Sequence, residues 1–216
     1  MSISNKLTDR NRKIISLVLN ALIVLLEIIG LGYSIQTHGI SLLQYYTELS
    51  NIFSMFACGA MAVATAKSLH TETYPMPRWV KNLKYMAACC LTVTLLVVVF
   101  VLSPMSEMGG LSFLMFHGSM LYHHLLCPVL VLVSFIFFEP TPQLKRSSIK
   151  LALLPTVVYG VVAFVLNLLK LLGGPYPFLK VYDQPAGMSV LWTVIIIGGA
   201  YLIALGLFFL NRRKAS

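Results

Sequence analysis

A short polar run near residue 47 could carry nucleophilic chemistry within an apolar segment. Thr47, Ser50, Asn51 and Ser54 are spaced i, i+3, i+4 and i+7, so on a helix they share one face. A threonine hydroxyl becomes nucleophilic when a neighbouring base takes its proton, and Ser50 and Asn51 are candidate oxyanion donors. The same residue types also hydrogen-bond membrane helices together, so both roles stay open. Glu48 is either part of this site or a headgroup-level charge at a helix N-terminus.

Three histidines in one later segment are candidates for the base. On a continuous helix His117 and His124 would point only about 20° apart, whereas His123 would point about 100° away from His124. Such a face suits a general base, a proton relay, or a metal or haem ligand; each histidine also has the ordinary explanation of a buried ring bonded to a hydroxyl or carbonyl. Because no carboxylate or second cluster matches them, we predict no metal site and no cofactor.

Two further regions hold polar or aromatic residues at informative positions. Asn20 and Glu27 lie in the first apolar segment, and Glu27 is deep enough to face the bundle interior or a water pocket. The segment Gly173–Leu179 places Tyr176 and Phe178 among prolines, which favours a stiff, extended backbone. This loop is expected either to fold back as a lid or to anchor at the interface through its rings.

The composition places these residues in a membrane. Of 216 residues, 58% are hydrophobic and 11% are charged, whereas a soluble domain carries about 25% charged residues. We predict an all-α integral membrane protein with one domain, residues 1–216, because no segment alternates in polarity as a β-barrel strand does. The six expected transmembrane helices are Ile14–Tyr33, Leu43–Ala66, Tyr85–Leu102, Leu114–Phe138, Leu151–Leu172 and Met188–Leu210.

The basic residues predict the orientation of the bundle. Fourteen of the 16 lysines and arginines fall on one side of the six expected helices, and only Lys170 and Lys180 fall on the other. The positive-inside rule therefore predicts a multi-pass cell-membrane protein with both termini in the cytoplasm. This asymmetry accounts for the net charge of +9, so we expect no nucleic-acid partner. The sequence predicts no particular oligomeric state.

Three motifs together resemble one family. They are the Tyr46-Thr47-x-x-Ser50-Asn51 opening, a histidine four residues before Pro128, and the loop Tyr176-Pro177-Phe178-Leu179. Their order and spacing are similar to those of the androgen-induced-gene membrane proteins and their bacterial six-helix relatives, over almost the whole chain. The characterised animal members are intramembrane hydrolases of lipid esters, acting on fatty acid esters of hydroxy fatty acids. The resemblance implies a bacterial plasma-membrane protein with a lipid-like substrate, Thr47 as nucleophile and His124 as base.

The sequence departs from the family pattern at two points. The animal-type spacing counts five residues back from the proline, which selects His123 instead of His124 as base. The acidic residue that the family often carries about ten positions after the histidine is Ser134 here. On ideal helices Thr47 would lie about 6 Å and His124 about 15 Å deep, so the pair requires helix tilt or a later start of the fourth helix.

A second class of function therefore stays open. It is a non-enzymatic binding or transport protein whose His117/His124 face holds a proton, a metal, haem or a small ligand.

Overall fold

The fold is helical throughout the described residues. The computed structural model describes residues 3–71, 75–106, 109–141 and 144–213, and within these ranges it contains helices and no strand. Six segments are long and apolar enough to cross a membrane, which confirms the predicted number of spans. In chain order the elements are α1 (Ile3–His38), η1 (Gly39–Gln44), α2 (Tyr46–His70), α3 (Arg78–Val97), η2 (Val98–Leu102), α4 (Ser103–Met105), α5 (Gly110–Phe116), η3 (Leu121–Leu126), α6 (Cys127–Val133), η4 (Ser134–Phe138), α7 (Ser147–Leu168), η5 (Pro177–Leu179) and α8 (Ala186–Arg213).

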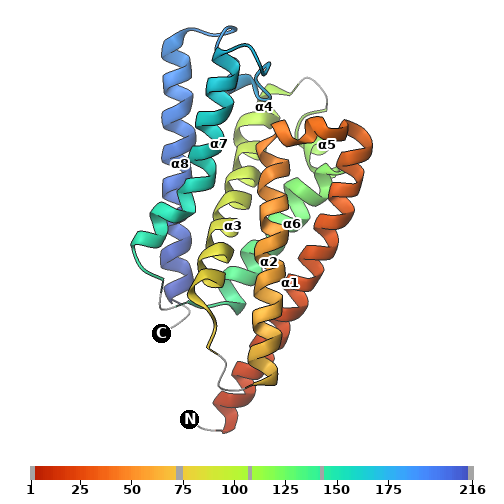
Figure 1. The fold of residues 1–216 in the computed structure, drawn as a ribbon, viewed down its shortest axis with the longest axis vertical. Coiled ribbons are helices and arrows are strands. Elements are labelled where there is room, and N and C mark those ends of the chain that lie inside the picture. Colours follow the sequence, from red (N-terminus) through yellow and green to blue (C-terminus); the bar gives the residue numbers. More distant parts are fainter. Residues whose placement is uncertain (1–2, 72–74, 107–108, 142–143, 214–216) are drawn as a thin grey trace.

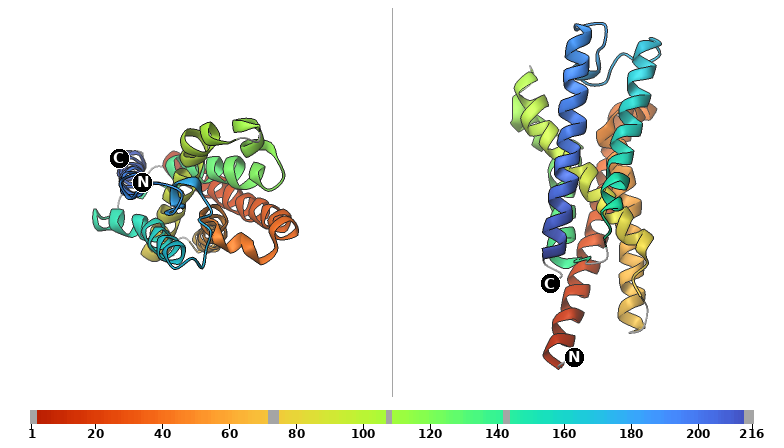
Figure 2. Two further views of the ribbon diagram at one scale, coloured as in Figure 1. Left: turned by 90° about the horizontal axis from the view of Figure 1, so that it is seen from above. Right: turned by 90° about the vertical axis from the view of Figure 1, so that its left-hand side faces the viewer.

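Helix α3 is the centre of the bundle. It packs against α2, α6, α7 and α8, and Figure 1 shows it between the α7–α8 pair and the α1–α2 pair. Its small residues Ala87, Ala88, Cys89 and Cys90 are fully buried. Small side chains at such positions let neighbouring helices approach closely. The long helices lie roughly along one axis, and the N- and C-terminal ends lie at the same end of the bundle (Figures 1 and 2).

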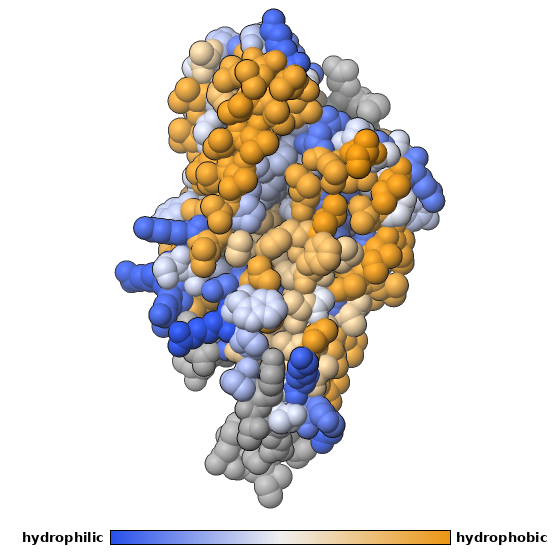
Figure 3. All heavy atoms as spheres, in the orientation of Figure 1, coloured by the Kyte–Doolittle hydropathy of each residue, from blue (hydrophilic) through white to orange (hydrophobic). Residues whose placement is uncertain are grey.

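The outer surface of the bundle is apolar. Phe56, Phe100 and Leu202 are each about two-thirds exposed or more (68%, 71% and 67%). In Figure 3 hydrophobic residues cover most of the middle of the visible face, and hydrophilic residues gather toward its lower part and at its upper edge. Large apolar side chains spread over such a surface are suited to contact with lipid tails.

The prediction is wrong for the first part of the fourth helix. The sequence predicts one helix over Leu114–Phe138, but α5 ends before His117, whose backbone is extended (φ −95°, ψ 125°), and Gly118 has a positive φ of 53°. Glycine favours this left-handed conformation because it lacks a Cβ. The span itself begins at Leu121. His117 and His124 therefore do not share a helical face, contrary to the sequence prediction.

The other spans differ from the predicted ones at their ends. Helix α1 continues well beyond the expected Ile14–Tyr33 in both directions. Helix α7 ends at Leu168 instead of Leu172, because Lys170 adopts a positive φ of 58° and the chain turns toward the following loop. Polar residues close to an apolar run can continue a helix, so hydropathy alone does not locate these ends.

Candidate functional site

The polar face predicted at the start of α2 is buried in the bundle. Thr47, Ser50, Asn51 and Ser54 are all buried. The Ser50 hydroxyl and the Asn51 amide both donate to the Thr47 carbonyl oxygen, at 2.9 and 2.8 Å. The Asn51 amide also donates to the carbonyl oxygen of His123, at 3.2 Å. This side chain therefore joins the Thr47 turn of α2 to the histidine segment η3.

His123 lies between two carboxyl groups. Its Nδ1 is 3.3 Å from Glu48 Oε1, and its Nε2 is 3.7 Å from Glu27 Oε2. The Ser34 hydroxyl donates to the same Glu48 oxygen, at 2.6 Å. Both Glu27 oxygens and Glu48 Oε2 are buried without a hydrogen-bond partner among the described residues. Buried charges of this kind require a proton or a counter-charge, so Glu27, Glu48 and His123 form one buried cluster of ionisable groups.

The adjacent His124 has a different environment. It is buried, and its Nδ1 is 2.6 Å from the carbonyl oxygen of Leu114. A carbonyl only accepts, so Nδ1 carries the hydrogen and Nε2 is the nitrogen with a free lone pair. His117 is exposed on the turn before η3 and stacks on Phe113, with ring centroids 4.6 Å apart. The structure thus brings His123 and His124 into the bundle and leaves His117 outside it.

An apolar cavity of about 360 Å³ adjoins Thr47. Residues of α3, α7 and α8 form its walls, among them Val97, Phe164 and Ile196. Thr47 and Thr94 contribute hydroxyl groups to this lining. Among the described residues that line it, none is charged and none is a histidine. The cavity therefore offers a hydrocarbon-like volume with a few hydroxyl groups on its wall, which suits an apolar chain carrying one polar group.

The aromatic loop folds back over this cavity. Tyr176 and Phe178 both line it, and their rings stack with centroids 5.2 Å apart. The Tyr176 hydroxyl accepts a hydrogen bond from the Thr47 backbone N–H at 3.2 Å and lies 3.4 Å from the Thr47 hydroxyl. Removal from water raises the pKa of the Tyr176 hydroxyl above its ordinary value. This hydroxyl therefore keeps its proton and can donate it to an oxygen in the cavity.

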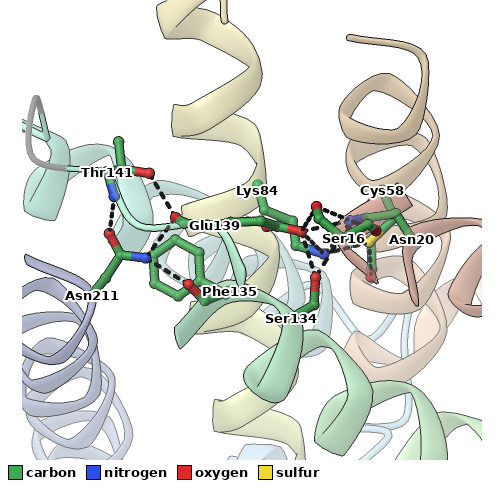
Figure 4. A network of polar contacts seen from close by, with 10 residues as sticks. Ser16, Asn20, Cys58, Lys84, Ser134, Phe135, Glu139, Thr141 and Asn211 are labelled. Atoms are coloured by element: carbon green, nitrogen blue, oxygen red, sulfur yellow. Dashed lines mark hydrogen bonds and ion pairs between the residues drawn. The ribbon is translucent and has the colours of Figure 1, made fainter. Parts of the chain in front are cut away.

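A second buried polar cluster joins α1, α3 and the end of η4 (Figure 4). Its centre is Lys84, which is fully buried and whose ammonium donates to Asn20 Oδ1 at 2.7 Å and to Cys58 Sγ at 3.2 Å. The ammonium is also 3.8 Å from Glu139 Oε1. That oxygen accepts hydrogen bonds from Ser16, Asn20 and Ser134.

Sequence reasoning missed most of this inner cluster. Lys84 and Glu139 each lie one position outside an expected helix and border a polar connecting segment, which predicts exposure instead of burial. The unusual signal was Asn20, since an amide in the middle of an apolar helix requires a partner in another helix. Ser134, the position at which the family often carries an acid, belongs to this cluster and lies away from His123 and His124.

The described residues contain no group of three or more histidine, cysteine, aspartate or glutamate side chains arranged to hold a metal ion. Comparison with protein-family models, with curated proteins and with solved structures finds no match to this chain. The resemblance to the androgen-induced-gene family therefore rests on the quoted motifs alone. Fold and site together define a helical protein whose six apolar helices are suited to a membrane, and its described residues include two buried polar clusters and an apolar cavity that adjoins Thr47.

Proposed function

We propose that this protein is an intramembrane hydrolase of lipid esters, of the type that joins a fatty acid to a hydroxy fatty acid, with Thr47 as the nucleophile. One observation carries the proposal: the Thr47 hydroxyl stands on the wall of an apolar cavity, beside the Tyr176 hydroxyl. An ester with long hydrocarbon chains fits such a volume, and these two hydroxyls are among the polar groups that its carbonyl would meet there.

In the proposed reaction Thr47 Oγ1 forms a bond to the ester carbonyl carbon and gives its proton to a histidine. The tetrahedral intermediate then releases the alcohol, which takes that proton, and water hydrolyses the acyl-threonine by the same route in reverse. Tyr176 is the favoured oxyanion donor because its hydrogen can point into the cavity. The hydrogens of Ser50 and Asn51 are directed at backbone carbonyls, which makes them positioning residues for the Thr47 turn.

His124 is the better candidate for the base. Both ring nitrogens of His123 face carboxyl groups, so neither is available to accept a proton from Thr47. The Nδ1 of His124 is held by a carbonyl, which leaves its Nε2 free for general-base chemistry. Thr47 is hydrogen-bonded to Tyr176 and not to a histidine in the ligand-free geometry. Catalytic hydrogen bonds often tighten only when substrate enters, and the proposal requires such a movement here.

A fluorophosphonate probe tests the nucleophile. The Thr47→Ala and His124→Ala variants should each lose labelling, and Thr47→Ser should keep part of it. The double variant should be little worse than either single variant, because groups that act as a unit are strongly non-additive. Thr92→Ala is a matched control, since this threonine lies in α3 outside the cavity and donates only to the Ala88 carbonyl.

Labelling that persists in a folded Thr47→Ala protein would exclude Thr47 as nucleophile. Loss of labelling in His123→Ala with retention in His124→Ala would keep the hydrolase and move the base by one residue. All variants need equal thermal stability in detergent before labelling is compared, since removing a buried polar partner costs about 1–3 kcal/mol.

A second function is favoured by the carboxyl groups around His123. With Glu27 and Glu48 ionised and His123 protonated, the cluster would carry a net charge of −1. One further proton would make it neutral, which is the state that a membrane interior favours. This property suits a proton-coupled binding or transport protein. Proteoliposomes with an internal pH-sensitive dye test it: proton uptake that Glu27→Gln abolishes and Thr47→Ala retains would select transport over hydrolysis.

We also propose the location. The chain would reside in the plasma membrane of a bacterium with both termini in the cytoplasm, which is supported by the distribution of basic residues and by the resemblance.

A further inference from the structure

The apolar cavity described above meets the outer surface of the bundle along α7. Thr156, Gly160 and Phe164 line it at intervals of four residues, so they form one row on this helix. Val161 and Val165 also line the cavity, and both are exposed on the outside of α7. The cavity therefore reaches the surface where these two rows of residues meet.

Gly160 leaves the middle of the first row without a side chain. A Cβ built at this position would meet no atom within 4 Å, so the space beside it is open. Glycine is a poor residue for the interior of a helix, and Gly160 does not adopt a positive φ that would require it. Its missing side chain instead provides room at the point where the cavity meets the surface.

Helix α8 forms the other edge of this opening. Ser189, Thr193 and Ile197 line the cavity at the same interval, and Thr193 is exposed. The aromatic loop covers the cavity at the end where α7 and α8 are connected, and its Phe178 ring packs against Trp192 with centroids 5.9 Å apart. The cavity is thus covered on the side of the loop and open between α7 and α8, where a membrane would supply hydrocarbon.

The lining of the cavity selects against charge. Among the described residues that line it, none carries a charged side chain. A hydrocarbon chain that moves from the bilayer into this cavity exchanges one apolar environment for another, so the move is nearly neutral. An ester carbonyl can gain a hydrogen bond from a hydroxyl on the wall, whereas a carboxylate loses its hydration without meeting a cation. The ligand that gains most is therefore a lipid ester without an ionised group.

We infer that the substrate is an uncharged lipid ester, one chain of which enters from the bilayer between α7 and α8, past Gly160. Within the proposed class of esters, this favours molecules in which the carboxyl group of the hydroxy fatty acid is itself esterified. The inference rests on the proposed hydrolase for its substrate, whereas its test measures binding alone.

Quenching of Trp192 fluorescence by brominated lipids in phosphatidylcholine vesicles tests the inference. Trp79→Phe leaves Trp192, on the cavity wall, as the only tryptophan, and Thr47→Ala in the same protein removes the proposed nucleophile. The methyl ester of dibromostearic acid should quench Trp192 with a relative binding constant about five-fold above that of brominated phosphatidylcholine, which corresponds to one hydrogen bond. Dibromostearate itself, ionised at about pH 9, should show no such preference.

Substitutions of two glycines test the path of entry. Gly160→Leu should abolish the preference for the ester, because the leucine side chain would occupy the open space, whereas Gly160→Ala should keep most of it. Gly198→Leu is the matched control, since Gly198 is an exposed glycine of α8 outside the cavity lining. A Cβ on Gly198 also meets no atom within 4 Å.

Four results would each overturn the inference. They are equal quenching by the ester and by brominated phosphatidylcholine, an equal preference for ionised dibromostearate, an unchanged preference in folded Gly160→Leu protein, and an equal loss in Gly198→Leu. The first two comparisons need no glycine variant, so they decide the matter even where Gly160→Leu does not fold.

The binding test and the nucleophile test can fail separately. A preference for the ester, together with fluorophosphonate labelling that persists in Thr47→Ala, would leave a lipid-binding cavity and remove the hydrolase. No preference for the ester, together with labelling that depends on Thr47, would keep the hydrolase and exclude an uncharged substrate that enters between α7 and α8.

Discussion

The ammonium group of Lys84 has no access to water, and an amide, a thiol and a carboxylate surround it. These partners stabilise the charged form of Lys84, because burying an ion without a partner costs several kcal/mol of desolvation free energy. The Glu139 carboxylate is itself held by three hydrogen-bond donors, so the pair belongs to a network that joins α1, α3 and the end of η4.

Removal of one member of this pair should therefore destabilise the fold strongly. Lys84→Met should lower the free energy of unfolding by about 3–5 kcal/mol, because it leaves the Glu139 carboxylate buried without its cation. The double variant Lys84→Met/Glu139→Gln should recover part of that loss. Denaturant titration in detergent measures both. Lys180→Met, at the exposed Lys180–Asp183 pair, should cost less than about 1 kcal/mol; a similar loss in both pairs would contradict the argument.

Tyr176 supports a second prediction at this scale. Tyr176→Phe removes the acceptor of the Thr47 N–H and should cost about 1–3 kcal/mol. It should also reduce probe labelling of Thr47. Since the pKa of this hydroxyl is raised, it stays protonated up to and beyond the ordinary tyrosine value of about 10, so its loss of a proton should not reduce labelling of the native protein between pH 7 and about 9. A fall in labelling with rising pH whose midpoint lies within that range, and which Tyr176→Phe removes, would refute the assigned role.

Whether the sequence predicts that a polar residue is buried depends on how far apart along the chain it and its partners lie. The buried face of Thr47, Ser50 and Asn51 follows from spacing within one helix, which a sequence displays directly. The contacts of Lys84 with Asn20 and Glu139 join residues more than 50 positions apart, and no local pattern contains them. Their positions next to polar segments made burial the less expected outcome.

At the scale of elements, the contact between α1 and η3 determines the position of His123. A Cβ on Gly30 would lie 2.5 Å from His123 Nε2 and 2.8 Å from the Tyr122 Cβ, whereas a Cβ on Gly32 would have no neighbour within 4 Å. Gly30 therefore permits a close approach of the two helices at the carboxyl–histidine cluster, as small residues do between membrane helices.

Gly30→Ala should displace His123 and destabilise the protein by about 1–3 kcal/mol, as overpacking does. Gly32→Ala should be neutral or stabilising by up to about 1 kcal/mol, because alanine is the better helix former and meets no atom. Thermal unfolding of the two variants in the same detergent provides the comparison. Equal stabilities would show that α1 and η3 are not in close contact at this position.

The fourth span shows the limit of periodicity at this scale. Its apolar composition correctly predicted a helix long and apolar enough to cross a membrane, but the break at His117 and Gly118 depends on backbone conformation that hydropathy does not report. The later start, at Leu121, brings the η3 histidines near the beginning of the span. On ideal helices Thr47 and His124 would lie at different depths, and a later start of the fourth helix is one of the two changes that would reduce this difference.

At the scale of the whole molecule, six membrane crossings would put the two chain ends on one side of the membrane, and Figure 1 draws both ends at the same end of the bundle. Reporter fusions at Ser216 and within residues 173–186 should therefore report opposite sides, with the C-terminus cytoplasmic. Inverted activities would reverse the orientation while leaving the bundle intact. Equal activities at both sites would contradict the six-span arrangement.

The number of spans was predictable because it depends only on length and hydropathy. The packing of the helices was not predictable from the sequence. The α1–α2 pair and the α7–α8 pair could each pack against the other helices in several arrangements that bury similar apolar surfaces. The apolar cavity arises from that packing, since its walls come from helices that are distant in sequence.

The wall of that cavity has a kinetic consequence. Val161 and Val165 line it and are 58% and 44% exposed on the outside of α7, so the cavity wall is continuous with the lipid-facing surface. A ligand that enters there never passes through water, and the concentration that governs its binding is its mole fraction in the bilayer. If the proposed hydrolase is correct, dilution of a fixed amount of its lipid substrate with inert phospholipid should slow turnover, whereas dilution of the vesicles with buffer should not.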